Sequence, residues 1–250
     1  MKRVPGIFVM LRFLRFAALI LLLPPAAFAD SSVCDVGSVY AWVNELRARR
    51  QLPQLAADPL LERTASAYAS DLSNRGILSH VDEQGRRALQ RYQAQGGTTV
   101  LVGEILGSGA ALTTVTAAWE ASPGHLDIVL KPIWTHCGAA AARSGSTVVW
   151  VLLFTSHRIY PLHILSTARG YLIRGRLAPV QGREPILLSG IEPVDPLDWD
   201  PASGEFSYFV SSERGGIYHR LGYSSTDGAL VVTNTFFPVS VTSDREREPR

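Results

Sequence analysis

An apolar run long enough to cross a membrane is missing from the start of the chain, where the apolar stretch covers only residues 16–23. A spanning helix needs roughly 20 such residues. Four basic residues precede this stretch, and Ala27 and Ala29 supply the small side chains of an A-x-A cleavage site. The arrangement predicts a signal peptide at residues 1–29 and export to the periplasm or the extracellular space. An uncleaved membrane anchor is the alternative.

An excess of basic residues is also missing once this leader is set aside. The whole chain has 24 Lys and Arg against 22 Asp and Glu. Residues 1–29 hold four of the bases and no acid, which leaves 20 against 22 and a net charge of −2. No basic stripe is left that would indicate a nucleic-acid partner.

Cysteine is scarce, because only Cys34 and Cys137 occur in the chain. In an oxidising compartment, an isolated pair most simply forms a disulfide. This bond would close a loop of about 100 residues and stabilise the fold by up to ~4.7 kcal/mol on the chain-entropy model. Two free buried thiols are the alternative. Metal binding by two cysteines so far apart in the chain is disfavoured.

The apolar pattern changes along the chain. The first half has helical spacing, as in Val39, Val43 and Leu46. Asp58-Pro59 is a strong helix start, and Gly76 suits the end of the same helix. Later residues form short apolar runs separated by turn signals, which are typical of strands. The main expected strands are residues 134–142, 147–154, 171–177, 185–189, 206–211, 217–223 and 229–237.

These patterns predict an α+β fold class, with an α+β domain at residues 30–157 and a small all-β, sandwich-like domain at residues 158–242. Within the second domain, the prolines at positions 193, 196 and 201 predict a long loop. The alternating charges of residues 243–250 predict a disordered tail.

Three polar residues lie at or beside predicted turns and helix ends, namely His80, Glu104 and His125. Glu104 interrupts an apolar run, and burying a carboxylate without a partner is costly. Its partner is a histidine, a metal ion or a backbone amide. Zn²⁺ is the default metal for two histidines and one glutamate, and a metal-free polar cluster is the alternative. Separations of 24 and 21 residues do not choose between them, whereas an H-E-x-x-H motif would fix two ligands on one helix.

The order of several short motifs carries more information than their spacing. The motifs are Asn44-Glu45-Leu46-Arg47, Ser79-His80 with Asp82 and Gly85, Gly103-Glu104, Trp119 with Ser122-Pro123-Gly124-His125, and Cys137-Gly138. Over about residues 35–155, this order resembles the CAP superfamily (cysteine-rich secretory proteins, antigen five and pathogenesis-related proteins), specifically its bacterial SCP-like branch. The resemblance implies an α-β-α sandwich and a cleft lined by two histidines and acidic residues, which sometimes binds metal. By position, His80, Glu104 and His125 match the cleft histidines and glutamate.

The chain departs from the family pattern at three positions. Ile105 stands where the family usually has asparagine, and Leu126 stands where it usually has arginine. Ser122 replaces the second glutamate of many members, and the nearby carboxylates Glu120 and Asp127 fall at other positions. These departures disfavour a site with four protein ligands and leave three protein ligands plus water as the alternative.

Several other residues have a structural expectation beside a functional one. Asp82 is expected to organise its loop through an Asx-type turn, with ligand support as the alternative. Trp119 is expected in the core, and Ser79 is disfavoured as a nucleophile because adjacent residues rarely face each other. His136 has no assigned role. His157, His163 and His219 are expected to be ordinary surface or interface residues, and Trp199, Tyr208, Tyr218 and Tyr223 are expected in the core, with a carbohydrate-binding face as the alternative.

Three functions fit these observations. The first is a non-catalytic, extracytoplasmic binding domain whose cleft takes a lipid, glycan or peptide, with an envelope protein as a further partner. It is favoured because no nucleophile and base, and no local metalloenzyme motif, are recognisable. The second is a Zn²⁺-assisted hydrolase of envelope peptide or ester bonds, with Glu120 or Asp127 as the general base. The third is a structural adaptor whose polar cluster only supports the fold.

Overall fold

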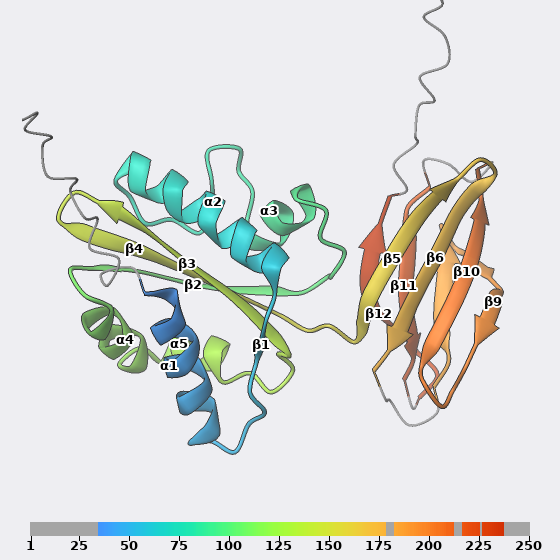
Figure 1. Cartoon of the computed structure of the whole chain (residues 1–250), viewed down its shortest axis with the longest axis horizontal. Coiled ribbons are helices and arrows are strands. Elements are labelled where there is room, and N and C mark those ends of the chain that lie inside the picture. The colour runs from blue at the N-terminus through green and yellow to red at the C-terminus, as the bar shows by residue number, and fades with distance from the viewer. Residues whose placement is uncertain (1–34, 179–182, 213–216, 226, 238–250) are drawn as a thin grey trace, which may run out of the picture. The chain divides into compact units, whose positions relative to one another are not determined.

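The computed structural model describes residues 35–178, 183–212, 217–225 and 227–237 (Figure 1). The predicted signal peptide, Cys34 and the charged tail lie outside the described residues. The sheet of a first part ends at Thr155, and the strands of a second part begin at Ile159, on either side of the predicted boundary. Within the described ranges, no helix combines the length and the apolar character needed to cross a membrane.

The first part is a four-stranded sheet with helices on both faces (Figure 1). The strand order is β1-β3-β4-β2, with β1 parallel to β3 and the other neighbours antiparallel. Helices α2 and α3 cover one face and α1, α4 and α5 cover the other, which confirms the α-β-α sandwich. The elements are α1 Val36–Ala48, β1 Ala56–Ala57, α2 Pro59–Arg75, α3 Ala88–Ala94, β2 Val102–Gly109, α4 Leu112–Glu120, α5 Pro123–Val129, β3 His136–Ser144 and β4 Thr147–Thr155.

Strand β4 forms the centre of this core because its apolar run is buried on both faces. Trp150, Leu152 and Phe154 pack with α1, α4 and α5. The alternate residues Val151 and Leu153 pack with α2 and α3. A strand covered on both faces reads as a continuous apolar run instead of an alternating one.

Helix α2 begins and ends as its sequence predicts. The Asp58 carboxylate accepts hydrogen bonds from the backbone N–H of Leu60 at 2.7 Å and Leu61 at 3.2 Å. Gly76 ends the helix in the left-handed conformation, with φ 66°. The helix lies directly on β3, because a Cβ atom added at Gly138 would sit 2.4 Å from the Cβ of Leu61. This close approach sets the distance between α2 and the sheet.

The described residues of the second part are dominated by β strands. It contains two four-stranded sheets, with strand orders β5-β6-β10-β9 and β12-β11-β7-β8, and a shared apolar cluster. This confirms the all-β region. Its strands are β5 Ile159–Thr167, β6 Gly170–Leu177, β7 Pro185–Ser189, β8 Glu192–Val194, β9 Pro196–Trp199, β10 Glu205–Ser211, β11 His219–Ser224 and β12 Leu230–Phe236.

The prediction of a long loop around the prolines at 193, 196 and 201 is wrong for its first half. Strands β8 and β9 occupy it and contain Pro193 and Pro196. Both strands lie at sheet edges, where a residue without a backbone N–H removes no ladder hydrogen bond. Strand β5, another edge strand, was also missed because few of its residues are buried.

The aromatic residues of the second part are mainly structural, as expected. Tyr208 is 1% exposed, and its hydroxyl donates to the carbonyl of Pro185 at 2.5 Å. Trp199 and Tyr223 pack against the same apolar cluster. Tyr218 is more exposed, at 39%. Tyr208 is therefore unavailable to a carbohydrate-binding face.

Arg47, the last residue of the first motif, is completely buried. Its Nε donates to the carbonyl of Pro53 at 2.9 Å, and its Nη1 donates to the carbonyls of Val129 at 2.8 Å and Lys131 at 3.1 Å. The guanidinium therefore joins α1 to the loop before β1 and to the end of α5. A cation at the carboxyl end of a helix is also favoured by the helix dipole.

We expect Arg47→Met to lower the free energy of unfolding by about 3 kcal/mol, because three carbonyls lose their donor. Urea denaturation measures this change. Arg49→Met is the matched control, since that side chain is 59% exposed and its ion pair with Glu120 spans 3.6 Å. The control should stay within ~0.5 kcal/mol of the parent. Equal effects of the two substitutions would contradict the role of Arg47.

Candidate functional site

Glu104 lies near the start of β2, which is an edge strand of the first sheet. In the ladder it faces Leu153 of β4, which belongs to the apolar cluster under α2 and α3. The residue is only 8% exposed. A carboxylate in this position needs compensation from nearby groups.

The carboxylate of Glu104 has two side-chain partners. One oxygen lies 2.8 Å from Nδ1 of His80, and the other binds Nη2 of Arg91. Arg91 comes from α3, and its side chain is 6% exposed. The sequence predicted that Glu104 has a partner and left its identity open. The structure identifies a histidine and an arginine, and the arginine was missed.

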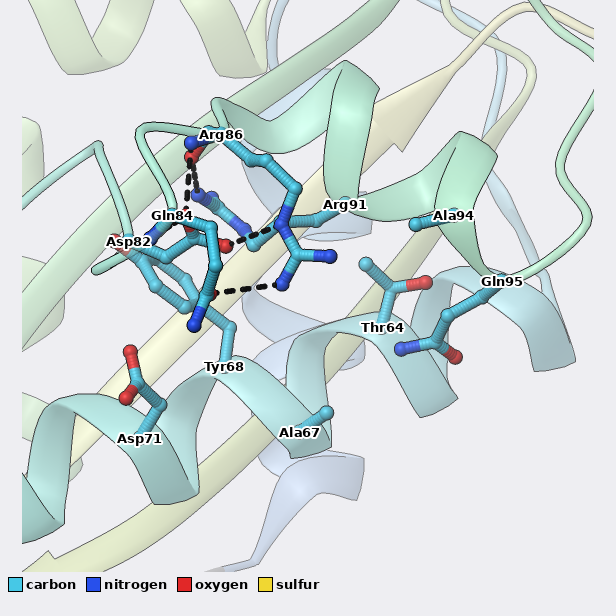
Figure 2. Close-up of a pocket in the computed structure, with 10 residues that line it drawn as sticks. All are labelled: Thr64, Ala67, Tyr68, Asp71, Asp82, Gln84, Arg86, Arg91, Ala94 and Gln95. Carbon is cyan, nitrogen blue, oxygen red and sulfur yellow. Dashed lines mark hydrogen bonds and ion pairs between the residues drawn. The ribbon is translucent and has the colours of Figure 1, made fainter.

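Arg91 is held by the loop that carries His80. Its guanidinium lies 3.4 Å from the centre of the Tyr68 ring, and its Nη1 donates to the carbonyl of Arg86 at 2.7 Å (Figure 2). The same Nη1 donates to the carbonyl of His80 at 3.3 Å. The Tyr68 hydroxyl donates to the carbonyl of Ser79. Helices α2 and α3 therefore fasten the loop at both ends.

Asp82 organises this loop, as predicted. One carboxylate oxygen accepts from the backbone N–H of Gln84 at 3.0 Å and Arg86 at 2.8 Å, and the other accepts from Nε of Arg86 at 2.8 Å. Burial alone would raise the pKa of Asp82, but these hydrogen bonds and the Arg86 charge lower it. Asp82 therefore stays ionised, and its role is to stabilise the conformation of the loop.

His80 is presented to solvent, because its side chain is 52% exposed although its Glu104 partner is buried. A carboxylate only accepts hydrogen bonds, so this contact assigns the proton to Nδ1 of His80. Nε2 is then the ring nitrogen that remains for another group.

His125 lies on α5, in the helical layer on the other face of the sheet. Its Nδ1 is buried and has no hydrogen-bond partner among the described residues. Burial lowers the pKa of His125, and the charge of His80 lowers it further. The two histidines are therefore close enough to interact, although only His80 contacts Glu104.

The three predicted metal ligands, His80, Glu104 and His125, do not converge on one point. In the described part of the chain, no three His, Cys, Asp or Glu side chains are grouped so that they could hold a metal ion. The physical reason is the engagement of both Glu104 oxygens, one with His80 and one with Arg91. The side chains as arranged do not fit a three-ligand Zn²⁺ site.

The other predicted supporting residues have mainly structural contacts. Trp119 is 2% exposed and donates from Nε1 to the carbonyl of Leu106 at 2.8 Å, as expected for a core residue. Glu120 accepts from Nε1 of Trp42 at 2.7 Å. Through this contact and its ion pair with Arg49, the Glu120 carboxylate is bound to residues at α1. These contacts disfavour Glu120 as a general base. Asp127 is exposed on α5.

Two histidines expected at the surface or an interface are buried. Nε2 of His157 lies 2.6 Å from the Asp58 carboxylate, and the two side chains are 7% and 6% exposed. The His157 ring is 4.6 Å from that of His136, whose pKa is lowered first by burial and then by the His157 charge. His219 is fully buried, whereas His163 is exposed as predicted. Sequence reasoning missed the Asp58–His157 contact because 99 residues separate the pair.

Cys137 is buried on β3 and makes no disulfide within the described residues, and burial raises the pKa of its thiol to about 12. Cys34 lies outside the described residues. The disulfide between Cys34 and Cys137 therefore stays a prediction.

We expect Glu104→Gln and Arg91→Met each to lower the free energy of unfolding by roughly 3–5 kcal/mol, because each leaves one charge buried without its partner. In the double variant, the loss of free energy of unfolding should be smaller than the sum of the two single losses. Chemical denaturation measures all three. Asp71→Asn, which breaks a partly exposed ion pair with Arg75, is the control and should cost at most about 1 kcal/mol. Additive losses in the double variant would contradict a coupled pair.

We expect the His125 ring to titrate below 6.5 in an NMR experiment, and His80→Gln to raise its pKa by removing one cause of the shift. Since the folded pKa lies below the unfolded value, the unfolded chain binds more protons, so His125 destabilises the fold as pH falls below about 6.5. His163→Gln is the control and should leave the titration unchanged. An unchanged His125 titration in His80→Gln would show that the histidines do not interact.

Comparison with known proteins places the first part in a family. Residues 40–154 match the model of the cysteine-rich secretory protein family, CAP. A Borreliella burgdorferi protein described as uncharacterized is 29% identical over 121 residues, which are 48% of this chain and 77% of the relative.

Two solved structures are also similar. An outer surface protein from Borrelia burgdorferi is 28% identical, with a TM-score of 0.45 over 47% of this chain and 89% of that one. An extracellular Bacillus anthracis protein containing an SCP domain is 21% identical, with a TM-score of 0.44 over 48% of this chain and 39% of that one.

The family match runs from within α1 almost to the end of β4 and includes His80, Glu104 and His125, but none of strands β5–β12. Residues 40–154 therefore form a CAP domain, and the match to the cysteine-rich secretory protein family rests on this part of the chain.

Proposed function

We propose that the CAP domain is an exported, non-catalytic binding module whose ligand contacts His80 and His125 beside β2. One observation carries this proposal: the buried pair of Glu104 and Arg91 fixes Nδ1 of a histidine whose side chain is half exposed. Nε2 of His80 is left as a hydrogen-bond acceptor at a defined position. The predicted signal peptide supports export.

The surroundings of His80 favour binding over catalysis. The Ser79 hydroxyl, the nearest candidate nucleophile in sequence, donates to the carbonyl of Val81 at 2.8 Å and accepts from the N–H of Val81 at 3.0 Å. It therefore belongs to the turn of the loop. Glu120 is engaged with Trp42. Neither residue supplies the nucleophile or base that a hydrolase needs beside His80.

The same loop indicates what the ligand carries. A hydroxyl or amide donor on the ligand fits Nε2 of His80, because that nitrogen accepts a hydrogen bond when the ring carries its proton on Nδ1 alone. Ile77 and Leu78, just before His80, are 49% and 48% exposed and offer apolar contact. A lipid headgroup, a glycan and a peptide all meet this requirement.

We expect calorimetric titration of the mature chain to show binding of trialanine or of phosphatidylglycerol vesicles, because their amide and hydroxyl groups supply the donor. His80→Ala and His125→Ala should weaken that binding roughly fivefold to tenfold, the loss of one hydrogen bond. His163→Ala removes an exposed histidine elsewhere and should leave the affinity unchanged.

Three outcomes would replace the proposal. Equal affinity in all variants would remove His80 and His125 from the binding site. Tight Zn²⁺ binding that is lost in both variants would favour the hydrolase. No binding of any probe, together with lower thermal stability of both variants, would favour the structural adaptor.

A further inference from the structure

A hollow lies on the surface of the CAP domain, between α2 and α3 (Figure 2). Thr64, Tyr68 and Asp71 of α2 line one side of it. Gln84, Arg86 and Gln95, from the loop before α3 and the end of that helix, line the other. Its volume of about 290 Å³ is at the lower end of the range for small-ligand sites. We call it the α2–α3 groove.

The charges around the α2–α3 groove are already paired. Asp71 lies 2.5 Å from Arg75, and Asp82 lies 2.8 Å from Arg86. The buried Arg91 is paired with Glu104. A charged ligand would have to compete with one of these ion pairs. A neutral ligand would leave them all intact.

The remaining hydrogen-bonding capacity belongs to uncharged groups. The side-chain amide of Gln95 makes no hydrogen bond within the described ranges, and that of Gln84 uses only its oxygen, with Arg86 at 3.1 Å. The Thr64 hydroxyl donates to the carbonyl of Leu60 at 2.8 Å, and this residue is only 1% exposed, which leaves the two glutamine amides as the groups open to a ligand. A side-chain amide offers donors and an acceptor side by side, which a sugar hydroxyl matches because it both donates and accepts.

The groove does not suit an apolar ligand. Ala67 and Ala94 are the two apolar residues among those that line it. The one aromatic ring, that of Tyr68, has the Arg91 guanidinium 3.4 Å from its centre, so that face is closed to stacking. Ligand recognition here depends on hydrogen bonds.

We infer that the α2–α3 groove is a second binding site, which takes a neutral sugar unit of a glycan through the exposed amides of Gln84 and Gln95. This site is distinct from the one at His80, but Arg91 is next to both. Arg91 lines the groove and also donates to the His80 carbonyl and to Glu104. Occupation of the groove therefore perturbs the His80 ring.

The test is a titration of the mature full-length chain with chitotriose and maltotriose as neutral probes, trigalacturonate as an anionic probe and trialanine as a peptide probe. Calorimetry gives the affinities, and NMR follows the His80 ring. We expect a neutral oligosaccharide to bind best and to shift the His80 signals. Gln84→Ala and Gln95→Ala should each weaken binding roughly fivefold, as expected for one lost hydrogen bond.

Two further variants separate the groove from the His80 site and from simple misfolding. Ala67→Trp, on the exposed surface of α2, should block binding without removing any hydrogen bond. Gln54→Ala, in an exposed loop outside the groove, is the matched control and should bind as the parent does. His80→Ala should retain groove binding, so failure of the His80 site and failure of the groove are distinguishable.

The inference is overturned by several results. Preference for trigalacturonate over both neutral probes, or trialanine binding that Ala67→Trp abolishes, would rule out a neutral glycan as the ligand of the groove. Oligosaccharide binding that survives Ala67→Trp would place it elsewhere on the chain. Absence of binding of both neutral probes at millimolar concentration would remove the site.

Discussion

The buried ion pair between Glu104 and Arg91 is the constraint on which the site depends. Glu104 lies on a sheet face that otherwise packs apolar residues such as Leu106 and Leu153. A lone carboxylate is not stable there, because its loss of hydration has to be offset by a nearby charge and hydrogen bonds. Arg91 supplies both, and it can do so because α3 lies beside β2 on that face. The position of His80 follows from this pair, since His80 binds the second oxygen of Glu104.

Arg91 also makes the site depend on contacts between segments that are far apart in the chain. Arg91 stacks on Tyr68 of α2, donates to two carbonyls of the intervening loop and pairs with β2. Three segments are joined through one side chain whose charge is hidden from water. Asp82 adds local order by closing the loop on itself. The loop is therefore held by long-range contacts at its ends and by an Asx-type turn within it, and neither set alone would fix the His80 ring.

Sequence reasoning succeeded where the cause of a feature is local. The start of α2 at Asp58-Pro59, its end at Gly76, and the Asp82 turn each depend on residues within a few positions, and each was predicted. Glu104 was expected to have a partner because an apolar strand cannot bury it alone. Arg91 was not identified, because nothing in its short helix distinguishes it from Arg86 and Arg87. The contact of His157 with Asp58 and the proline-containing edge strands likewise depend on neighbours that the sequence does not place.

Arg91 also bears on how this CAP domain differs from the pattern that its motifs resemble. A second carboxylate at position 122 would add negative charge to the cleft, but this chain has Ser122. The one remaining carboxylate, Glu104, is already neutralised by Arg91. A divalent cation approaching Glu104 would therefore meet a guanidinium at the same carboxylate, and that repulsion is strong where water is excluded. The charge balance favours a neutral hydrogen-bonding ligand over a metal ion at this edge of the sheet.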